Sequence, residues 1–420
     1  MNITCTVLMA LLVCFTNSFG ALPKEISPND YRGSDTERIQ QAIEDATETT
    51  CQIRIPSYNA NGTNIWMIDS AILLPSNIKL ILDNCTIQLS DQSRDNMFRS
   101  DNVGLGISDP IWNENIDIIG VGDVTLRGAD HPRATGDGAR KLVRDPQKEM
   151  EKGNYRVSYG RDAGNKEMKQ TGDWRNILIL IAYVNKFTLK NVKIENTHAW
   201  SVSFERTVNA KLSNIRIENS EFINIEGKKL ATSNKDGINL RQGCKYFRID
   251  NISGKTGDDF IALSNLDVNY DAPKPNGSLN STMVTSARWY GPEDDIEQIV
   301  ITNVSCENRY RGIAIRASGQ AGIHDVYING LIFKGLQDRY EAILLGGKGY
   351  GKLSLSGKIN NIYALNVIGN GRSLVRIEAP VHNCHFMNGM YNGENEAPTL
   401  YNIDKSKVEN ITENDWKKVQ

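Results

Sequence analysis

Neither sign of charge is in excess in this 420-residue chain, which carries 48 Lys and Arg against 50 Asp and Glu. A dedicated nucleic-acid-binding protein normally shows a clear basic excess, so we expect no nucleic-acid partner. Hydrophobic residues make up 40% of the chain and charged residues 23%. These proportions are those of a globular protein and exclude a disordered chain.

Long hydrophobic runs are also missing. The apolar run from Val7 to Phe15 is too short to span a membrane, and the small residues Ser18 and Gly20 follow it. This pattern predicts a secretory signal over residues 1–20 and a secreted or periplasmic mature protein, with a buried N-terminal strand as the alternative. No later stretch is long and apolar enough for a membrane span, so we expect none.

Cysteine is sparse and carries no metal-binding spacing. Seven are present, and Cys5 and Cys14 fall within the predicted signal. The other five are widely separated and form no CxxC pair, so we expect no structural zinc site. Because five is an odd number, at least one thiol is free, and packing in the core is the favoured interpretation. These residues are Cys51, Cys85, Cys244, Cys306 and Cys384.

Helical periodicity is scarce. One helix is predicted just after Ser34, where Ser34 and Glu37 have the spacing of a capping box. The apolar residues that follow recur at the spacing of one helix face. They are Ile39, Ala42, Ile43 and Ala46. Beyond this helix the sequence favours strands.

Two kinds of short β-rich phrase recur along the rest of the chain. The first has an Asn near its middle, and the intervals between successive Asn residues are 23, 37, 52 and 26. The second is an apolar alternation, and its closest internal match is between residues 309–315 and residues 339–345. The Asn residues are Asn191, Asn214, Asn251, Asn303 and Asn329, and the second phrases end at Phe204, Leu240, Leu263, Ile315, Leu345 and Ile377.

Strands that recur without intervening helices predict an all-β solenoid, in which each strand stacks on its counterpart in the next coil. We therefore expect a single-domain right-handed parallel β-helix within residues 21–420, with its coils from about 50 to 400. The N-terminal helix would cover its first coil. A propeller is the alternative, but it requires a clearer period. Polar stretches over about 128–174 and 266–297 interrupt the repeat and predict loop insertions.

The sharpest cluster of chemically competent residues is Asp236 followed by Asp258 and Asp259. Asp236 and Asp258 are 22 residues apart, close to one coil, so stacked coils would bring the three carboxylates together. Like charges at short range raise the pKa of at least one group, which supplies a general acid beside a base. Such a pair can cleave a glycosidic bond. Asp-rich turns and a Ca²⁺ site are the alternatives.

These motifs resemble those of glycoside hydrolase family 28, the polygalacturonase and rhamnogalacturonase group. The run 234–237 (Asn-Lys-Asp-Gly) and the run 257–259 (Gly-Asp-Asp) match the first two signature motifs of that family in order and spacing. The phrase over 197–202 and the Gly-x-x-Thr-Leu-x-Gly phrase over 122–128 are similar to earlier parts of the family pattern.

The resemblance implies roles for the three carboxylates. Asp258 would be the general acid, and Asp236 with Asp259 would hold and deprotonate the attacking water. It also implies inversion of the anomeric centre, with no cofactor and no metal ion. The carboxyl separation that accompanies inversion is about 6.5–9.5 Å.

The sequence departs from the family pattern at the next two motifs. No Gly-His-Gly follows the Asp pair, and residues 280–282 (Asn-Ser-Thr) take the place expected for it. The family's Arg-Ile-Lys is replaced by residues 314–316 (Ala-Ile-Arg), so Arg316 falls near the Lys position. Five residues on strands expected beside the cleft are candidate substrate contacts. They are His198, Arg241, Arg311, Arg316 and Glu341.

The function predicted from the sequence is an inverting glycoside hydrolase, acting as a monomer on a pectic or other acidic polysaccharide or oligosaccharide of plant type. One alternative is a polysaccharide lyase on the same fold, in which the carboxylates would bind Ca²⁺ and Arg316 would face the uronate. The second is a glycan-binding β-helix without catalytic activity. Sensitivity of cleavage to chelation would distinguish the lyase from the hydrolase.

Overall fold

The computed structural model describes residues 25–419, with gaps at 94, 105–106, 108, 132–138, 142–168, 172–173, 198, 221, 226, 232–235, 269–277, 281–288, 337–338 and 348–351. The predicted signal over residues 1–20 lies outside the described residues. Across the part that is described, no helix is long and apolar enough to cross a membrane.

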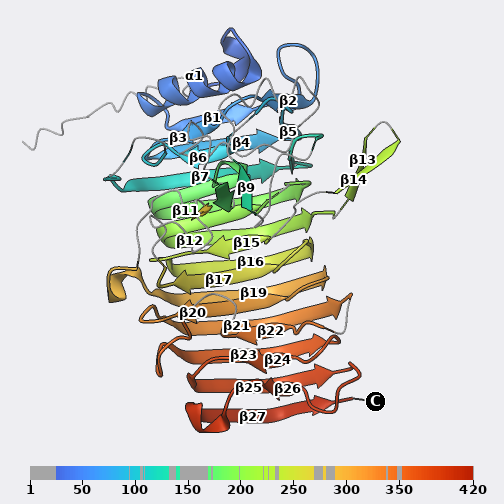
Figure 1. The fold of residues 1–420 in the computed structure, drawn as a ribbon. Coiled ribbons are helices and arrows are strands. Elements are labelled where there is room, and N and C mark those ends of the chain that lie inside the picture. The colour runs from blue at the N-terminus through green and yellow to red at the C-terminus, as the bar shows by residue number, and fades with distance from the viewer. Residues whose placement is uncertain are drawn as a thin grey trace, which may run out of the picture.

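Twenty-two strands form one sheet that winds into a stack of coils along the length of the molecule (Figure 1). Each strand pairs in parallel with its counterpart in the next coil, as Leu212 with Ile249 and Ile249 with Ile301. The predicted parallel β-helix is therefore confirmed. Each coil contributes strands to three walls, which we call wall A, wall B and wall C in the order in which the longest strands cross them.

Two long strands cross all three walls in one pass. Residues with positive φ mark where they change direction, among them Tyr183 at 53° and Asn191 at 58°. The strands are β11 (Ile179–Glu195) and β12 (Val202–Glu218).

Wall A otherwise consists of short strands. These are β3 (Ile72–Leu74), β6 (Phe98–Ser100), β15 (Ile238–Leu240), β17 (Ile261–Leu266), β20 (Ile313–Ser318), β22 (Ile343–Leu345), β24 (Val375–Ile377) and β26 (Thr399–Tyr401).

Walls B and C are separate strands in the first coils and continuous strands later. The early strands of wall B are β1 (Gln52–Ile55), β4 (Ile78–Asp83) and β7 (Asn113–Val121), and those of wall C are β2 (Ile65–Ile68), β5 (Thr86–Leu89) and β8 (Thr125–Arg127). The strands that cross both walls are β16 (Lys245–Lys255), β19 (Ile296–Asn308), β21 (Ile323–Gly335), β23 (Ile359–Gly369), β25 (Val381–Tyr391) and β27 (Val408–Lys418).

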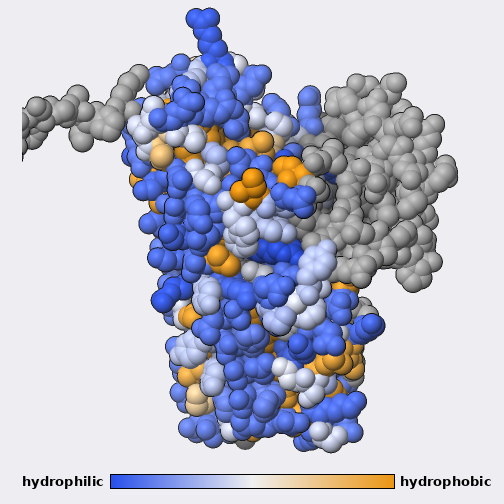
Figure 2. Space-filling view, turned by 90° about the vertical axis from the view of Figure 1, so that its left-hand side faces the viewer, coloured by the Kyte–Doolittle hydropathy of each residue, from blue (hydrophilic) through white to orange (hydrophobic). Residues whose placement is uncertain are grey.

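The core lies inside the coils, because alternate side chains of each strand point inward. The apolar residues that end the second repeated phrase stack in register, as Phe204 with Leu240 and Leu240 with Leu263. Phe204 is fully buried and meets Phe187 and Phe247 edge-on, with ring centroids 5.5 and 5.1 Å apart. On the face shown in Figure 2 the described surface is mostly hydrophilic, as the same alternation requires.

The repeated Asn residues form a ladder at the corner between walls B and C. Asn214 donates to Asn191 Oδ1 at 2.9 Å, and Asn251 donates to Asn214 Oδ1 at 2.8 Å. The side chain of Asn tolerates the left-handed backbone that this corner requires. The prediction of Asn329 as the last member of this ladder is wrong by one residue. Asn329 pairs with Thr302, which precedes the corner, so the corner itself is occupied by Gly330, with φ of 78°.

The predicted N-terminal helix is confirmed as α1 (Asp35–Thr47), with both halves of the Ser34–Glu37 capping box formed. Its four predicted apolar residues are all buried, and it packs against β1, β2 and β3 at the end of the stack (Figure 1). The helix therefore covers the apolar end of the first coil. Single turns of 3-10 helix occur as η1 (Pro28–Asp30), η2 (Trp174–Asn176), η3 (Pro292–Asp294) and η4 (Lys405–Lys407).

The two predicted insertions, described only in part, pair with each other. One contributes β9 (Ala139–Lys141) and β10 (Lys169–Thr171), and the other contributes β18 (Ser278–Asn280), which lies parallel to β10. A third insertion was not predicted. It forms a hairpin of β13 (Phe222–Ile225) and β14 (Lys228–Ala231) that projects from the stack just before Asp236 (Figure 1).

The five cysteines outside the predicted signal are all free thiols, and four of them are buried. Burial raises the pKa of Cys85, Cys244 and Cys384 to about 12. They therefore stay protonated at neutral pH, and their packing role is confirmed.

Candidate active site

Three carboxylates meet where two adjacent coils enter wall A. Asp236 precedes β15, and Asp258 and Asp259 precede β17. One oxygen from each lies within 4.8 Å of one from each of the others. The predicted convergence is thus present, but with a different register. Ile238 pairs with Ile261, an offset of 23 residues, so Asp236 aligns with Asp259 rather than with Asp258.

A bend brings the adjacent residues Asp258 and Asp259 into the same site, although on a straight strand they would face opposite ways. Thr256 Oγ1 donates to the Asp258 carbonyl at 2.9 Å and starts the bend. The buried Asn308 side chain donates to the carbonyls of Asp258 and Arg311, which joins this coil to the next one. The bend therefore depends on side-chain hydrogen bonds from both coils.

Asp236 is held by a residue that sequence reasoning missed. Asn239 is 1% exposed, and its Nδ2 donates to Asp236 Oδ2. The sequence alone could have identified Asn239, because it is the polar residue between Ile238 and Leu240 and must point out of the coil.

Asp259 is 1% exposed and is paired with two guanidinium groups. Arg311 Nη1 lies 3.1 Å from its Oδ1, and Arg316 Nη2 lies 2.5 Å from its Oδ2. A buried carboxylate needs such partners to remain charged. Asp258 is only half-buried, which leaves it the most accessible of the three carboxylates.

Glu341 is enclosed by the protein and pairs with Arg311. It is fully buried, and its Oε1 lies 3.1 Å from Arg311 Nε. Arg376, another residue that sequence reasoning missed, lies on its other side at 3.8 Å. Burial raises the pKa of Glu341 despite the two nearby cations. The side chain is enclosed and pairs with Arg311, and its contact with substrate stays a prediction.

Arg311 joins the carboxylate cluster to Glu341. Burial lowers the pKa of its guanidinium, but the charges of Asp259 and Glu341 outweigh burial and raise that pKa. Its guanidinium also lies 4.9 Å from the ring of Tyr340, which packs against Tyr310 one coil earlier at 4.6 Å. The structure therefore stacks the two halves of the internal match, as the sequence predicts.

The two remaining predicted contacts have different outcomes. Arg241 is 5% exposed, directly follows β15, and its guanidinium stacks over the Trp200 ring at 4.5 Å. Its Nε is buried and has no hydrogen-bond partner among the residues that the structure describes. His198 lies outside the described residues.

The predicted position of residues 280–282 is wrong. Residues 280–282 were expected in the coil that follows the Asp pair. In the structure β17 instead stacks directly on β20, with Ile261 opposite Ile313, so residues 309–311 occupy that coil. Residue 280 ends β18 in the side sheet, and 281–282 lie outside the described residues. Ile261 and Ile313 are 52 residues apart, more than twice the 23-residue offset of the preceding coil, so the sequence does not indicate this register.

The cluster is poorly suited to a divalent cation although three carboxylates converge. Both oxygens of Asp259 already face guanidinium groups, and these positive charges repel an incoming cation. One water between the carboxylates is compatible with the geometry. Three oxygens within 4.8 Å of one another can each reach a shared water at about 2.8 Å. The 4.8 Å limit applies to single oxygens, whereas the roughly 6.5–9.5 Å of inverting enzymes is measured between carboxyl groups, so the two figures describe different distances.

Residues 152–326 match the family model described as glycosyl hydrolases family 28. This region contains all three carboxylates and both guanidinium partners of Asp259. No curated protein matches the sequence.

Several solved structures share the fold. The exopolygalacturonase of Thermotoga maritima has a TM-score of 0.53 and 15% identity over 91% of this chain and 92% of that chain. The family 28 exopolygalacturonase of Yersinia enterocolitica has a TM-score of 0.53 and 13% identity over 95% and 78%. A double mutant of the tailspike of E. coli bacteriophage HK620 has a TM-score of 0.55 and 12% identity over 93% and 65%. At these identities the likeness concerns the fold alone.

Proposed function

We propose, from the glycoside hydrolase family 28 domain that this chain carries, that the protein is an inverting hydrolase of pectic or other acidic polysaccharides. The observation that supports this best is the convergence of Asp236, Asp258 and Asp259 on one buried site within the family region. The same proposal includes export of the chain, which the sequence over residues 1–20 suggests.

The environments of the three carboxylates support different roles. Asp259 faces two guanidinium groups, and Asp236 accepts a hydrogen bond from Asn239. These two would hold and deprotonate the attacking water. Asp258, the more accessible carboxyl, would protonate the leaving oxygen.

The arginines of the site argue against the lyase alternative. A lyase needs a free base beside the uronate. Arg311 and Arg316 instead pair with Asp259 at 3.1 and 2.5 Å, and Arg311 also pairs with Glu341. Their positions suit the support of a catalytic carboxylate better than proton abstraction.

The test is the release of reducing ends from a panel of pectic and neutral polysaccharides, with and without chelator. Wild type should cleave an acidic substrate in the presence of chelator. Asp258→Asn and Asp236→Asn should each lower the rate by about two orders of magnitude or more. Asp123→Asn is the matched control, because that Asp is exposed at the turn between β7 and β8. Unchanged turnover in Asp258→Asn would refute the assignment of the acid.

A further inference from the structure

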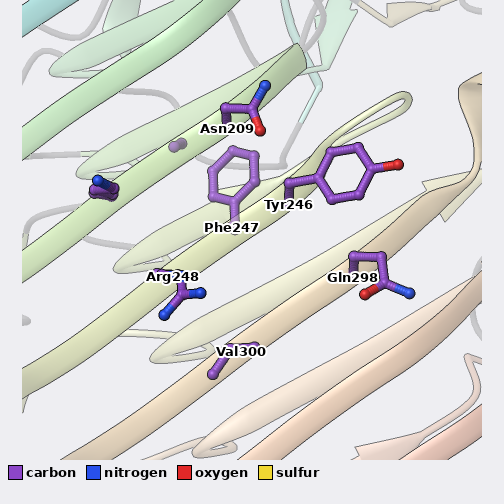
Figure 3. A pocket seen from close by; sticks show the side chains of 8 residues that line it. Asn209, Tyr246, Phe247, Arg248, Gln298 and Val300 are labelled. Atoms are coloured by element: carbon purple, nitrogen blue, oxygen red, sulfur yellow. The ribbon is translucent and has the colours of Figure 1, made fainter.

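A hollow on wall B lies outside the carboxylate site. It encloses about 310 Å³, which is near the lower end of small-molecule pockets. Neighbouring strands β12, β16 and β19 supply its lining, and Figure 3 shows the side chains that surround it. The lining residues with polar side-chain atoms are Asn209, Lys211, Tyr246, Arg248 and Gln298.

Tyr246 is an exception in the corner that it occupies. The equivalent corner position holds Asn209 in the previous coil and Gln298 in the next, and all three have φ between 57° and 59°. Asn is favoured in this left-handed conformation, whereas a bulky aromatic residue is disfavoured there. Tyr246 is nevertheless present and 52% exposed. A strained aromatic residue that leaves half of its surface exposed points to a binding role rather than to packing.

Two cations lie in register two residues beyond this corner along their strands. Lys211 pairs with Arg248 across β12 and β16, and both side chains are exposed. Within the described ranges neither has an ion-pair partner, whereas the neighbouring Lys245 pairs with Glu297 at 2.8 Å. The lining of the hollow therefore combines two cations, an exposed aromatic side chain and two side-chain amides.

The same line of outward side chains continues along the stack. Arg248 pairs with Val300, Val300 with Tyr327, and Tyr327 with Tyr363. Both of these tyrosines are 36% exposed. The two tyrosines therefore lie in adjacent coils beyond Val300, on the line that Lys211 and Arg248 begin. Exposed rings and cations along one wall suit an extended chain of sugar units better than a single small molecule.

We propose that this hollow is a second carbohydrate-binding site, which takes a uronate residue of an acidic polysaccharide. The Tyr246 ring would stack on the sugar ring, Lys211 and Arg248 would bind its carboxylate, and Asn209 and Gln298 would bind its hydroxyls. The site would hold the polymer on wall B, whereas the carboxylate cluster lies where the coils enter wall A. The proposal goes beyond the proposed hydrolysis and does not require it.

The experiment is native affinity electrophoresis in gels that contain polygalacturonate, with dextran gels as the neutral comparison. Every protein carries Asp258→Asn, so that the polymer stays intact. Adding Tyr246→Asn, or Lys211→Gln with Arg248→Gln, should weaken the apparent affinity for polygalacturonate by about fivefold or more. Higher ionic strength should weaken it further.

Two controls separate binding from folding. Tyr58→Ala removes another exposed tyrosine, 63% accessible, and should leave retardation unchanged. Tyr246→Asn should unfold at the same temperature as its parent or at a higher one, because Asn tolerates the left-handed corner.

Equal retardation of parent and Tyr246→Asn would overturn the proposal, and so would equal retardation by dextran. The result is separable from the catalytic test. Loss of retardation in Tyr246→Asn supports the second site even if no polysaccharide is cleaved. Cleavage without that loss refutes the second site alone.

Discussion

Replacing Phe204 by Ala should destabilise the coil that carries the carboxylate site. Phe204 is fully buried and lies edge-on between Phe187 and Phe247, with centroid distances of 5.5 and 5.1 Å. A buried Phe→Ala change costs about 3–5 kcal/mol, and each lost aromatic pair adds about 0.5–1.5 kcal/mol. Because neighbouring coils relax in part, we expect a total of about 4–6 kcal/mol.

The assay is urea unfolding followed by circular dichroism. Phe204→Leu is the matched control, which keeps apolar volume but removes both ring contacts, and should cost about 1–2 kcal/mol. Coils contact only their neighbours, so the loss should appear as early unfolding of the central coils, with a smaller slope for that phase. A cost of less than about 1 kcal/mol for Phe204→Ala would refute the view that this ring stack anchors the core.

Three further predictions concern backbone, charge and catalysis. Gly254→Ala should lower the free energy of unfolding by about 3 kcal/mol or more, because φ is 124° and the new Cβ would lie 1.9 Å from a backbone oxygen. Gly357→Ala is the control: φ is 77° but the space is open, so it should cost about 1 kcal/mol. Thermal unfolding measures both. Burial raises the pKa of Glu341 in the folded protein above 4.5, so the free energy of unfolding of the wild type should fall as pH rises from 4.5 through that pKa. Urea unfolding of Glu341→Gln should show no such fall. Parallel dependence of the unfolding free energy on pH in the two proteins would contradict this. Arg316→Gln leaves Asp259 with one guanidinium partner and should lower kcat by about tenfold or more, which steady-state kinetics would measure; an unchanged kcat would count against a catalytic role for Asp259.

Local chemistry was predictable because its signals lie close together in the sequence. The capping box of Ser34 and Glu37 predicts the start of α1, since its two partners are only three positions apart. The apolar alternation predicts the stacking of Phe204 on Leu240, because inward residues must align when coils stack. The all-β solenoid therefore follows from repeated local patterns.

Register across insertions was not predictable in the same way. Asp236 aligns with Asp259 rather than Asp258, and a spacing of 22 or 23 residues looks alike in sequence. Arg206 forms a buried bidentate pair with Asp294, 88 residues away and across insertions of irregular length. No periodic signal connects such partners, because the insertions break the repeat that would align them.

Among the site residues, the outward alternation could identify Asn239, but the sequence could not distinguish an enclosed Glu341 from an exposed one. Burial of an outward side chain depends on what covers the wall, which the strand pattern does not encode. The aromatic residue at Tyr246 was missed for another reason. Its significance appears only when its corner is compared with the Asn and Gln residues above and below it.

The central claim is that the three carboxylates direct water to a glycosidic bond. The most direct measurement is the mass of the products formed from polygalacturonate in water enriched in ¹⁸O. Hydrolysis predicts saturated products that together gain one water for each bond cleaved, with the label at the new reducing end. Unlabelled products with an unsaturated terminus would contradict the claim, because elimination adds no water.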